Sequence, residues 1–180
     1  MAEVQEKKEK QFKANLMKNT VSSNAKEAFE VYNKSLIGDQ KGDKIYFSLI
    51  EAFYLLERKR IAIYEGKKKL DREKFLNKLK KAEPDFWTRY SVFADMRNRG
   101  YILKTALKFG ADFRVYEKGK KPGQAHAKWL VFPVHESSKL TWREFAAKVR
   151  VANSTKKRLL IGILDDENDV TYYEINWQKP

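Results

Sequence analysis

Apolar side chains in the first half of the chain recur at the three- and four-residue spacing of helices that bury one face. This spacing predicts helices over 25–35, 43–57, 71–81 and 86–96, and shorter apolar runs predict a hairpin over 11–24 and a strand over 61–64. Asp43, Asp71 and Asp85 stand where an aspartate caps the first turn of a helix. We therefore expect residues 1–84 to form a helix-rich structural domain with a small antiparallel sheet, in which residues 1–10 are a flexible tail.

The second half of the chain changes to short apolar runs and alternating positions, which are typical of strands. The pattern predicts strands over 101–104, 112–116, 125–134, 159–164 and 170–177. Between them, Thr141 and Glu144 have the spacing of a capping box that opens a helix. Its buried stripe is expected to consist of Trp142, Phe145, Ala146 and Val149. Residues 85–180 are thus expected to form an α/β domain with a mixed sheet flanked by helices, so that the whole chain is α+β.

The composition indicates a class of binding partner and excludes several kinds of catalytic and metal site. Hydrophobic residues make up 42% of the chain, enough for a core, and the formal net charge of +14 favours a polyanionic partner, most commonly nucleic acid. The alternative interpretation of this charge is a lysine-rich proteome, in which every protein carries more positive charge. The absence of cysteine excludes disulfides, thiol catalysis and cysteine zinc sites, and only two histidines argue against a histidine-rich metal centre. The scarcity of these ligands leads us to expect no cofactor and no metal. No apolar run approaches the ~20 residues that span a bilayer, so we expect a cytoplasmic protein.

Candidate chemistry centres on a histidine beside a lysine-rich loop. An imidazole ordinarily titrates near pH ~6.5, which suits general acid or base work. Strand alternation predicts that His126 shares a wet face with Lys128, opposite Ala125 and Ala127. The alternative interpretation is a surface histidine near a turn. The second histidine, His135, gives no comparable signal and is assigned no role.

Two further groups are weighed in the same way. Tyr116 ends the preceding predicted strand, and ammonium groups in the loop after it would favour its anion as a proton acceptor. Packing at a strand end is the simpler interpretation for this tyrosine. In the run Lys156-Lys157-Arg158, a positioned cation would stabilise the charge of a pentacoordinate phosphorane. As an isolated observation, such a run is more often a solvated patch.

Taken together, these segments resemble the archaeal tRNA-splicing endonucleases (tRNA-intron lyases) of the homotetrameric type. The resemblance covers nearly the whole chain. It is carried by FEVYNKSLIGDQKGDKIYFSLIEAFYLLERKRIAI in the first half, and by FWTRYSVFADMRNRGYILKTALKFGADFRVYEKG, AHAKWLVF and VRVANSTKKRLLIGILDDENDVTYYEI in the second. The resemblance implies an N-terminal structural domain over 1–84 and a C-terminal catalytic domain over 85–180.

The resemblance also implies the roles of particular residues. The family's catalytic tyrosine, histidine and lysine fall on Tyr116, His126 and Lys157, with Lys156 as the alternative lysine. The arginine that clamps an extruded intron base falls on Arg150, with Tyr172 as a candidate partner across the base. The implied reaction is like that of ribonuclease A: it needs no metal and leaves a 2′,3′-cyclic phosphate and a 5′-hydroxyl end.

The implied substrate is precursor tRNA, cut at a bulge–helix–bulge that is recognised by shape. One catalytic set per chain implies assembly, and in homotetrameric relatives an acidic loop docks in a basic groove of the other dimer. Here the acidic residues that stand in that loop are Asp165, Asp166, Glu167 and Asp169. The final strand would pair across the dimer. The alternatives are a non-catalytic, RNA-binding structural subunit of a heteromeric enzyme, and a metal-dependent nuclease, for which the acids near Tyr116 and His126 are too few.

Overall fold

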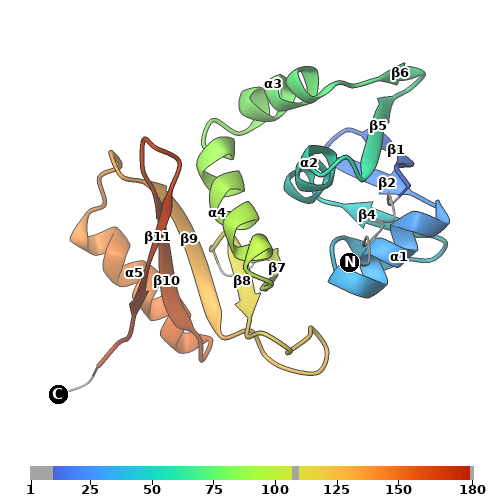
Figure 1. Cartoon of the computed structure of the whole chain (residues 1–180). Coiled ribbons are helices and arrows are strands. Elements are labelled where there is room, and N and C mark those ends of the chain that lie inside the picture. The colour runs from blue at the N-terminus through green and yellow to red at the C-terminus, as the bar shows by residue number, and fades with distance from the viewer. Residues whose placement is uncertain (1–9, 107–109, 179–180) are drawn as a thin grey trace, which may run out of the picture. The chain divides into compact units, whose positions relative to one another are not determined.

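The computed structural model describes residues 10–106 and 110–178, and the chain divides into two compact units, Met1–Glu83 and Pro84–Pro180 (Figure 1). The division comes one residue before the boundary expected from the sequence. The tail expected over 1–10 lies, apart from Lys10, outside the described residues. No helix in the described part of the chain combines the length and the apolarity that a membrane span requires.

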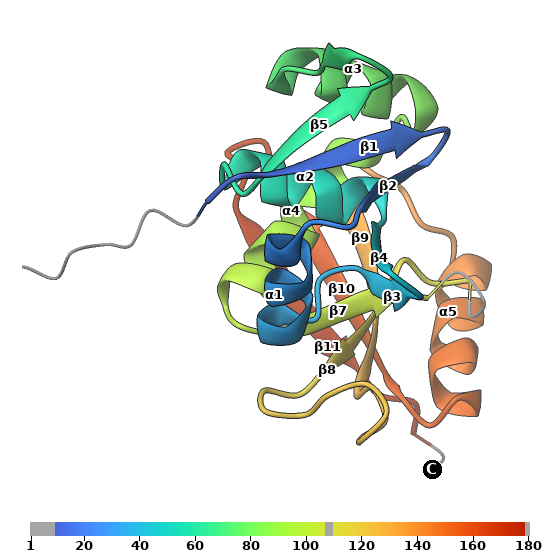
Figure 2. The ribbon, with the colours of Figure 1, turned by 90° about the vertical axis from the view of Figure 1, so that its right-hand side faces the viewer.

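The first unit contains a six-stranded sheet with the order β3-β4-β2-β1-β5-β6. Its strands are β1 Phe12–Met17, β2 Thr20–Ser23, β3 Asp39–Lys41, β4 Lys44–Phe47, β5 Ile61–Glu65 and β6 Lys68–Lys69, and its helices are α1 Lys26–Ser35, α2 Leu49–Glu57 and α3 Arg72–Ala82. The hairpin expected over 11–24 is confirmed as β1 and β2. The prediction of a small antiparallel sheet is wrong, because β5 pairs in parallel with β1 and makes the sheet mixed (Figure 2). The described part of this unit is therefore not simply helix-rich.

The helix that the sequence predicted from Asp43 begins later, at Leu49. Residues 44–47 are strand β4, in which Ile45 and Phe47 point into the core with the two-residue period of a strand. Ser48 caps α2 in place of Asp43, and its capping box with Glu51 is complete. The buried Glu51 carboxylate also accepts the backbone N–H of Gly38 at 2.9 Å, which ties the start of the β3–β4 hairpin to the helix.

The second unit contains a five-stranded mixed sheet with the order β11-β10-β9-β8-β7. Its strands are β7 Ile102–Thr105, β8 Phe113–Tyr116, β9 Trp129–His135, β10 Arg158–Leu164 and β11 Val170–Ile175, and its helices are α4 Phe86–Asn98 and α5 Trp142–Ser154. The pairing of β9 with β10 is parallel and the other pairings are antiparallel. The α/β architecture expected for this half is confirmed, as is the α+β class of the chain.

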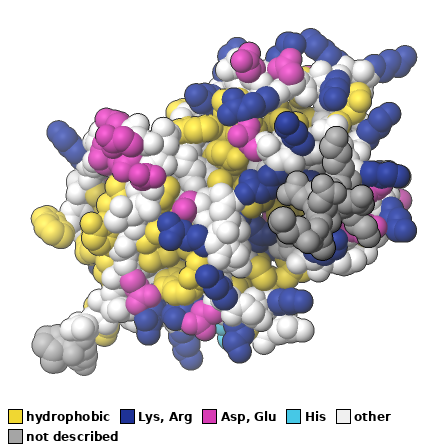
Figure 3. All heavy atoms as spheres, in the orientation of Figure 1, with side chains coloured by type: hydrophobic (Ala, Val, Ile, Leu, Met, Phe, Trp, Pro, Cys, Tyr) yellow, Lys and Arg dark blue, Asp and Glu magenta, His cyan; other side chains and the backbone are white. Residues whose placement is uncertain are grey.

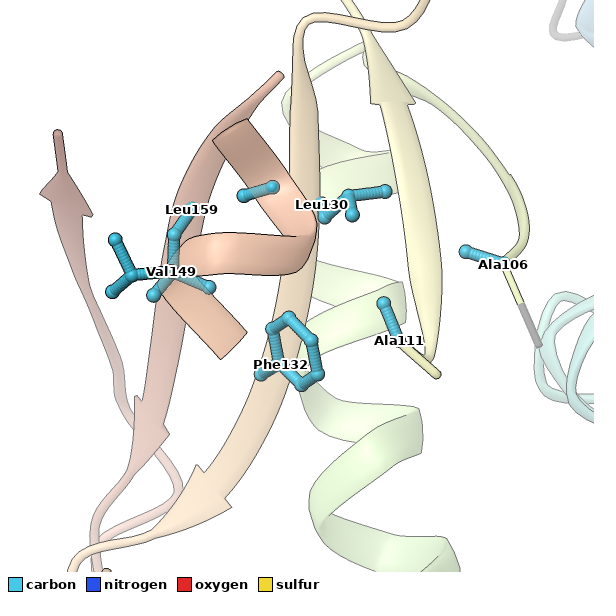
Figure 4. Close-up of a cluster of buried hydrophobic side chains, with 7 residues drawn as sticks. Ala106, Ala111, Leu130, Phe132, Val149 and Leu159 are labelled. Atoms are coloured by element: carbon cyan, nitrogen blue, oxygen red, sulfur yellow. The ribbon is translucent and has the colours of Figure 1, made fainter. Parts of the chain in front are cut away.

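The two helices of this unit cover opposite faces of its sheet. On one face, Phe93 of α4 packs against Phe113, and Gly162 lets α4 approach closely, because a Cβ there would lie 2.9 Å from Val92. On the other face, a buried cluster joins α5 to the strands (Figure 4), and it consists of Ala106, Ala111, Leu130, Phe132, Val149, Ala152 and Leu159. Alternation along each strand therefore decides which helix a side chain meets.

The buried stripe expected on α5 is partly wrong. Val149 is buried, but Trp142 is 85% exposed and its ring lies edge-on against Phe145. Trp142 is the first residue of the helix, so its aromatic contact is with the next turn and not with the sheet. Ala152, one turn beyond Val149, is the second buried residue of the helix.

Candidate active site

A pocket of about 390 Å³ opens where β8, the loop between β8 and β9, and the start of β10 meet. It is lined by Arg114, Tyr116, Gly123, Gln124, Ala125, His126, Ala127 and Lys157. The three residues for which the sequence indicated chemistry, Tyr116, His126 and Lys157, thus line one cavity, although about forty positions of chain separate the first from the last. Every lining residue belongs to the second unit.

Tyr116 is the last residue of β8 and is buried, with 4% of its surface exposed. Phe113 and Val115 point to the α4 side of the sheet, so alternation directs Arg114 and Tyr116 to the α5 side. The strand is held on both sides, by β7 and by β9. The phenol therefore enters the pocket from a rigid element.

His126 lies in the loop before β9, because the strand expected from Ala125 begins only at Trp129. The backbone N–H groups of Gln124 and Ala125 both donate to the carbonyl of Lys121, which closes a turn and prevents an extended chain there. The predicted sharing of a strand face with Lys128 is therefore wrong. His126 is exposed to solvent within the pocket lining.

Lys157 is directed into the pocket by the end of α5. The N–H of Lys157 donates to the carbonyl of Ala152 and that of Lys156 to Asn153, and Lys156 has a left-handed φ of 55°. This pair of bonds is a Schellman motif, which reverses the chain directly after the helix. The Lys157 ammonium donates to the carbonyl of Thr155 at 2.8 Å.

The three cations of the run Lys156-Lys157-Arg158 differ in some of their contacts. Lys157 lines the first pocket, whereas Lys156 does not. Arg158 forms an ion pair with Glu174 at 2.6 Å, and Glu174 also accepts the indole N–H of Trp129. These donors hold the pKa of Glu174 below its ordinary value, with the Trp129 hydrogen bond as the largest cause.

A second pocket of about 200 Å³ adjoins the first through Lys157. It is lined by Val149, Ala152, Asn153, Lys156, Lys157, Arg158, Ile175, Asn176 and Trp177. Trp177 is 53% exposed, so much of its ring surface is available to a planar group.

Arg150 and Tyr172 are not brought together. Arg150 is exposed on α5, on one side of the sheet. Tyr172 pairs with Gly162 and lies on the α4 side, where its hydroxyl donates to Asp95 at 2.7 Å. Burial and the Asp95 carboxylate raise the pKa of the Tyr172 phenol. Tyr172 is therefore a packing contact between β11 and α4.

An ion pair between Glu117 and Lys128 joins the residue after β8 to the residue before β9. Hydrogen bonding from Lys128 lowers the pKa of the Glu117 carboxyl. Because Glu117 and Glu174 are both paired with cations, neither carboxylate is left to neutralise the pocket itself. In residues 10–106 and 110–178, no three His, Cys, Asp or Glu side chains lie close enough together to hold a metal ion.

The acidic residues expected to join dimers form the turn between β10 and β11. Figure 3 shows acidic side chains gathered on one part of a surface that is otherwise rich in lysine and arginine. The Asp165 carboxylate accepts the N–H of Asp169 and so stabilises the turn. Asp166 is 82% exposed and lies 3.4 Å from the imidazole of His135, and Asn168 accepts the indole N–H of Trp87.

Sequence reasoning missed two residues that line these pockets, Arg114 and Trp177. For Arg114 a signal was present, because it stands two residues before Tyr116 and must share its face in a strand. For Trp177 the sequence offered no signal, because it was predicted as the end of the last strand, whereas β11 ends at Ile175. Its place beside Lys157 depends on how β11 pairs with β10.

Comparison with known proteins follows the same division of the chain. The family model described as the tRNA intron endonuclease N-terminal domain matches residues 12–76, and the one described as the catalytic C-terminal domain matches residues 86–172. The chain is 42% identical over 154 residues to a tRNA-splicing endonuclease of Nanoarchaeum equitans, covering 82% of this chain and 96% of the relative.

Two further relatives with the same name are similar. The protein of Pyrococcus abyssi is 41% identical over 158 residues, covering 88% of this chain and 91% of the relative. That of Methanothermobacter thermautotrophicus is 40% identical over 153 residues, covering 85% and 89%. Both domain models match in order, and the identity extends over most of each chain, so the resemblance found in the sequence is confirmed. The chain belongs to the tRNA intron endonuclease family.

Proposed function

We propose that this protein excises introns from precursor tRNA by cutting at bulge–helix–bulge sites without a metal ion, leaving a 2′,3′-cyclic phosphate and a 5′-hydroxyl end. The observation that carries the proposal is the pocket in which Tyr116, His126 and Lys157 meet. A phenolate, an imidazolium and an ammonium can serve as the proton acceptor, the proton donor and the cation that such a cleavage requires. The exposed setting of this pocket suits a substrate as large as an RNA bulge.

The proposed reaction uses the RNA's own nucleophile. Tyr116, as its phenolate, accepts the proton of the ribose 2′-hydroxyl as the 2′ oxygen attacks the adjacent phosphorus. The bond from phosphorus to the 5′ oxygen then breaks, and His126, as its imidazolium, donates a proton to that leaving oxygen. Lys157 stabilises the additional negative charge on the phosphorane oxygens. The 2′,3′-cyclic phosphate and the 5′-hydroxyl follow directly from which bonds form and break.

Base recognition is proposed for the side of the molecule that carries α5. An extruded base needs a flat cation or an aromatic ring on each face. Arg150 remains the proposed first clamp residue. Trp177 replaces Tyr172 as its proposed partner, because Tyr172 is bonded to Asp95 on the opposite face of the sheet, whereas Trp177 lines a pocket beside Lys157.

The proposed function predicts cleavage in the presence of excess chelator. A minimal bulge–helix–bulge RNA, incubated with the protein and EDTA, should be cut at both bulges, and end-group analysis should find cyclic phosphate and 5′-hydroxyl termini. A duplex of the same composition without bulges is the control substrate. Binding without cutting would favour the alternative of a structural subunit, and activity restored only by Mg²⁺ would favour the metal-dependent nuclease.

We further propose assembly into a homotetramer, in which two dimers are joined through the acidic turn. The turn carries acid on a chain of net charge +14, so it is attracted to basic surfaces of other copies. In the single chain, β11 is an edge strand of its sheet, and Tyr173 on that strand is 56% exposed. An exposed edge can pair with another strand, and this supports the proposal that β11 pairs across the dimer.

Neutralising the tip of the acidic turn should convert tetramers into dimers. The informative variant is Asp166→Asn with Glu167→Gln, which leaves the turn-stabilising Asp165 intact. Its elution on a sizing column with light scattering gives the mass of the particle. Glu30→Gln with Glu73→Gln, which removes the same charge from exposed positions of the first unit, is the control and should remain tetrameric. Tetramers of the turn variant would disprove the role of these acids.

A further inference from the structure

Arg114 is the member of the pocket lining that the reaction described above leaves without a role. It lies on β8 two residues before Tyr116 and pairs with Lys104 on one side and Leu130 on the other. Its side chain lines the same cavity as Tyr116, His126 and Lys157. A guanidinium is always protonated in proteins, so the cavity holds at least two cationic side chains.

Arg114 is half-buried, and its guanidinium is not fully paired. Its Nε atom is shielded from solvent and has no hydrogen-bond partner within the described part of the chain. An unpaired buried donor is unfavourable, and more so when it carries charge. The two carboxylates closest to Arg114 in the chain, Asp112 and Glu117, are held by Arg89 and Lys128. An arginine with an unpaired Nε therefore borders a cavity of about 390 Å³ that no carboxylate of the described residues lines.

We propose that Arg114 binds the substrate directly, donating to a non-bridging oxygen of the phosphate at the cleavage site. This inference rests on the proposed function. The planar fork of an arginine matches two phosphate oxygens, whereas an ammonium acts as a point charge. Arg114 would fix the orientation of the phosphate and share with Lys157 the charge that develops on the phosphorane. No covalent step is added to the reaction.

The proposal explains why the fold retains an arginine whose Nε–H is shielded from solvent and unpaired within the described residues. Groups preorganised for a transition state are often unfavourable in the free protein, because their partner is the substrate. Removing such a group should lower activity while leaving stability unchanged or higher. A structural arginine would behave in the opposite way, since its loss would lower both together.

The test compares Arg114→Met, Arg114→Lys and the wild type, with Arg143→Met as the control. Arg143 is exposed in the first turn of α5 and lines neither pocket, and its replacement removes the same charge. In single-turnover cleavage of the bulge–helix–bulge RNA, Arg114→Met should be about 10²-fold slower, Arg114→Lys should recover part of the rate, and Arg143→Met should cut normally. The melting temperature of Arg114→Met should equal or exceed that of the wild type.

Inorganic phosphate supplies a readout that does not depend on cleavage. Phosphate should raise the melting temperature of the wild type and of Arg143→Met, and should have little effect on Arg114→Met. Normal cleavage by Arg114→Met, or a lower melting temperature together with an unchanged response to phosphate, would overturn the assignment. Failure of the wild type to cut the RNA, with the phosphate response intact, would instead refute the proposed function and leave only an anion site.

Discussion

Replacing His126 with alanine should lower the rate of intron excision by about 10²–10⁴-fold, the range typical for loss of a positioned general acid. The 5′ oxygen is a poor leaving group unless it is protonated as its bond to phosphorus breaks, and no other imidazole lines the pocket. Because His126 is exposed in a loop, its loss removes little packing and should leave the melting temperature almost unchanged. RNA binding should also change little, since the proposed contact is made in the transition state.

The measurement is the single-turnover rate with a bulge–helix–bulge RNA at saturating protein. His135→Ala is the matched control, because the other histidine bonds to Ser137 and does not line the pocket. Both variants should first be shown to elute like the wild type, since His135 also lies beside the acidic turn. Partial recovery of His126→Ala by imidazole in solution would support proton donation. Unimpaired turnover of that variant would remove His126 from the mechanism.

The second large effect is expected on the cleavage rate when Lys157 is replaced, and its neighbour Lys156 is the control, because the two lysines have the same charge but lie in different places. Lys157→Met should lose on the order of 3 kcal/mol of transition-state stabilisation, or roughly 10²-fold in rate, because its ammonium lines the pocket of Tyr116 and His126. Lys156→Met removes the same charge from the second pocket only. It should weaken RNA binding modestly and leave the cleavage rate of bound RNA nearly intact.

Rates of bound RNA and affinities, measured at one salt concentration, separate the two lysines. If both variants lose affinity equally and neither loses rate, the run Lys156-Lys157-Arg158 is only a phosphate-binding patch. If Lys156→Met alone loses rate, the catalytic lysine is Lys156. Both residues follow α5 and keep their backbone N–H bonds when the side chain is changed, and Lys157→Met additionally removes the bond from its ammonium to the carbonyl of Thr155.

Local sequence predicted elements well where one signal acted alone. Asp71 caps α3 as expected, and the capping box of Thr141 and Glu144 opens α5. The prediction failed where two signals competed. The helical spacing before Glu57 obscured the four-residue strand β4, and the helix cap predicted at Asp43 is formed by Ser48 instead. Pairing between distant strands decided that outcome, since β4 exists only through its bonds to β2 and β3.

The same contrast holds for the site. The residues indicated Tyr116, His126 and the run Lys156-Lys157-Arg158 as candidates, and the resemblance to the family implied their roles and singled out Lys157. Their approach to one another depends on sheet order and on the turns that end α5 and precede β9. Arg150 and Tyr172, which were expected to clamp one base, lie on opposite sides of the sheet, because the strand register directs Tyr172 to the α4 side. The same alternation along β8 directs Arg114 to the side of the sheet on which Tyr116 lies.

The amino-acid sequence by itself determined the family, the order of most elements and the kinds of group available for chemistry, because these depend on side-chain identity and local spacing. Only the tertiary structure decided which lysine joins Tyr116, which face carries each aromatic ring, and that Arg114 borders the same cavity. Those outcomes arise from strand register and chain reversal between residues far apart in sequence, where a shift of one residue turns a side chain to the other face.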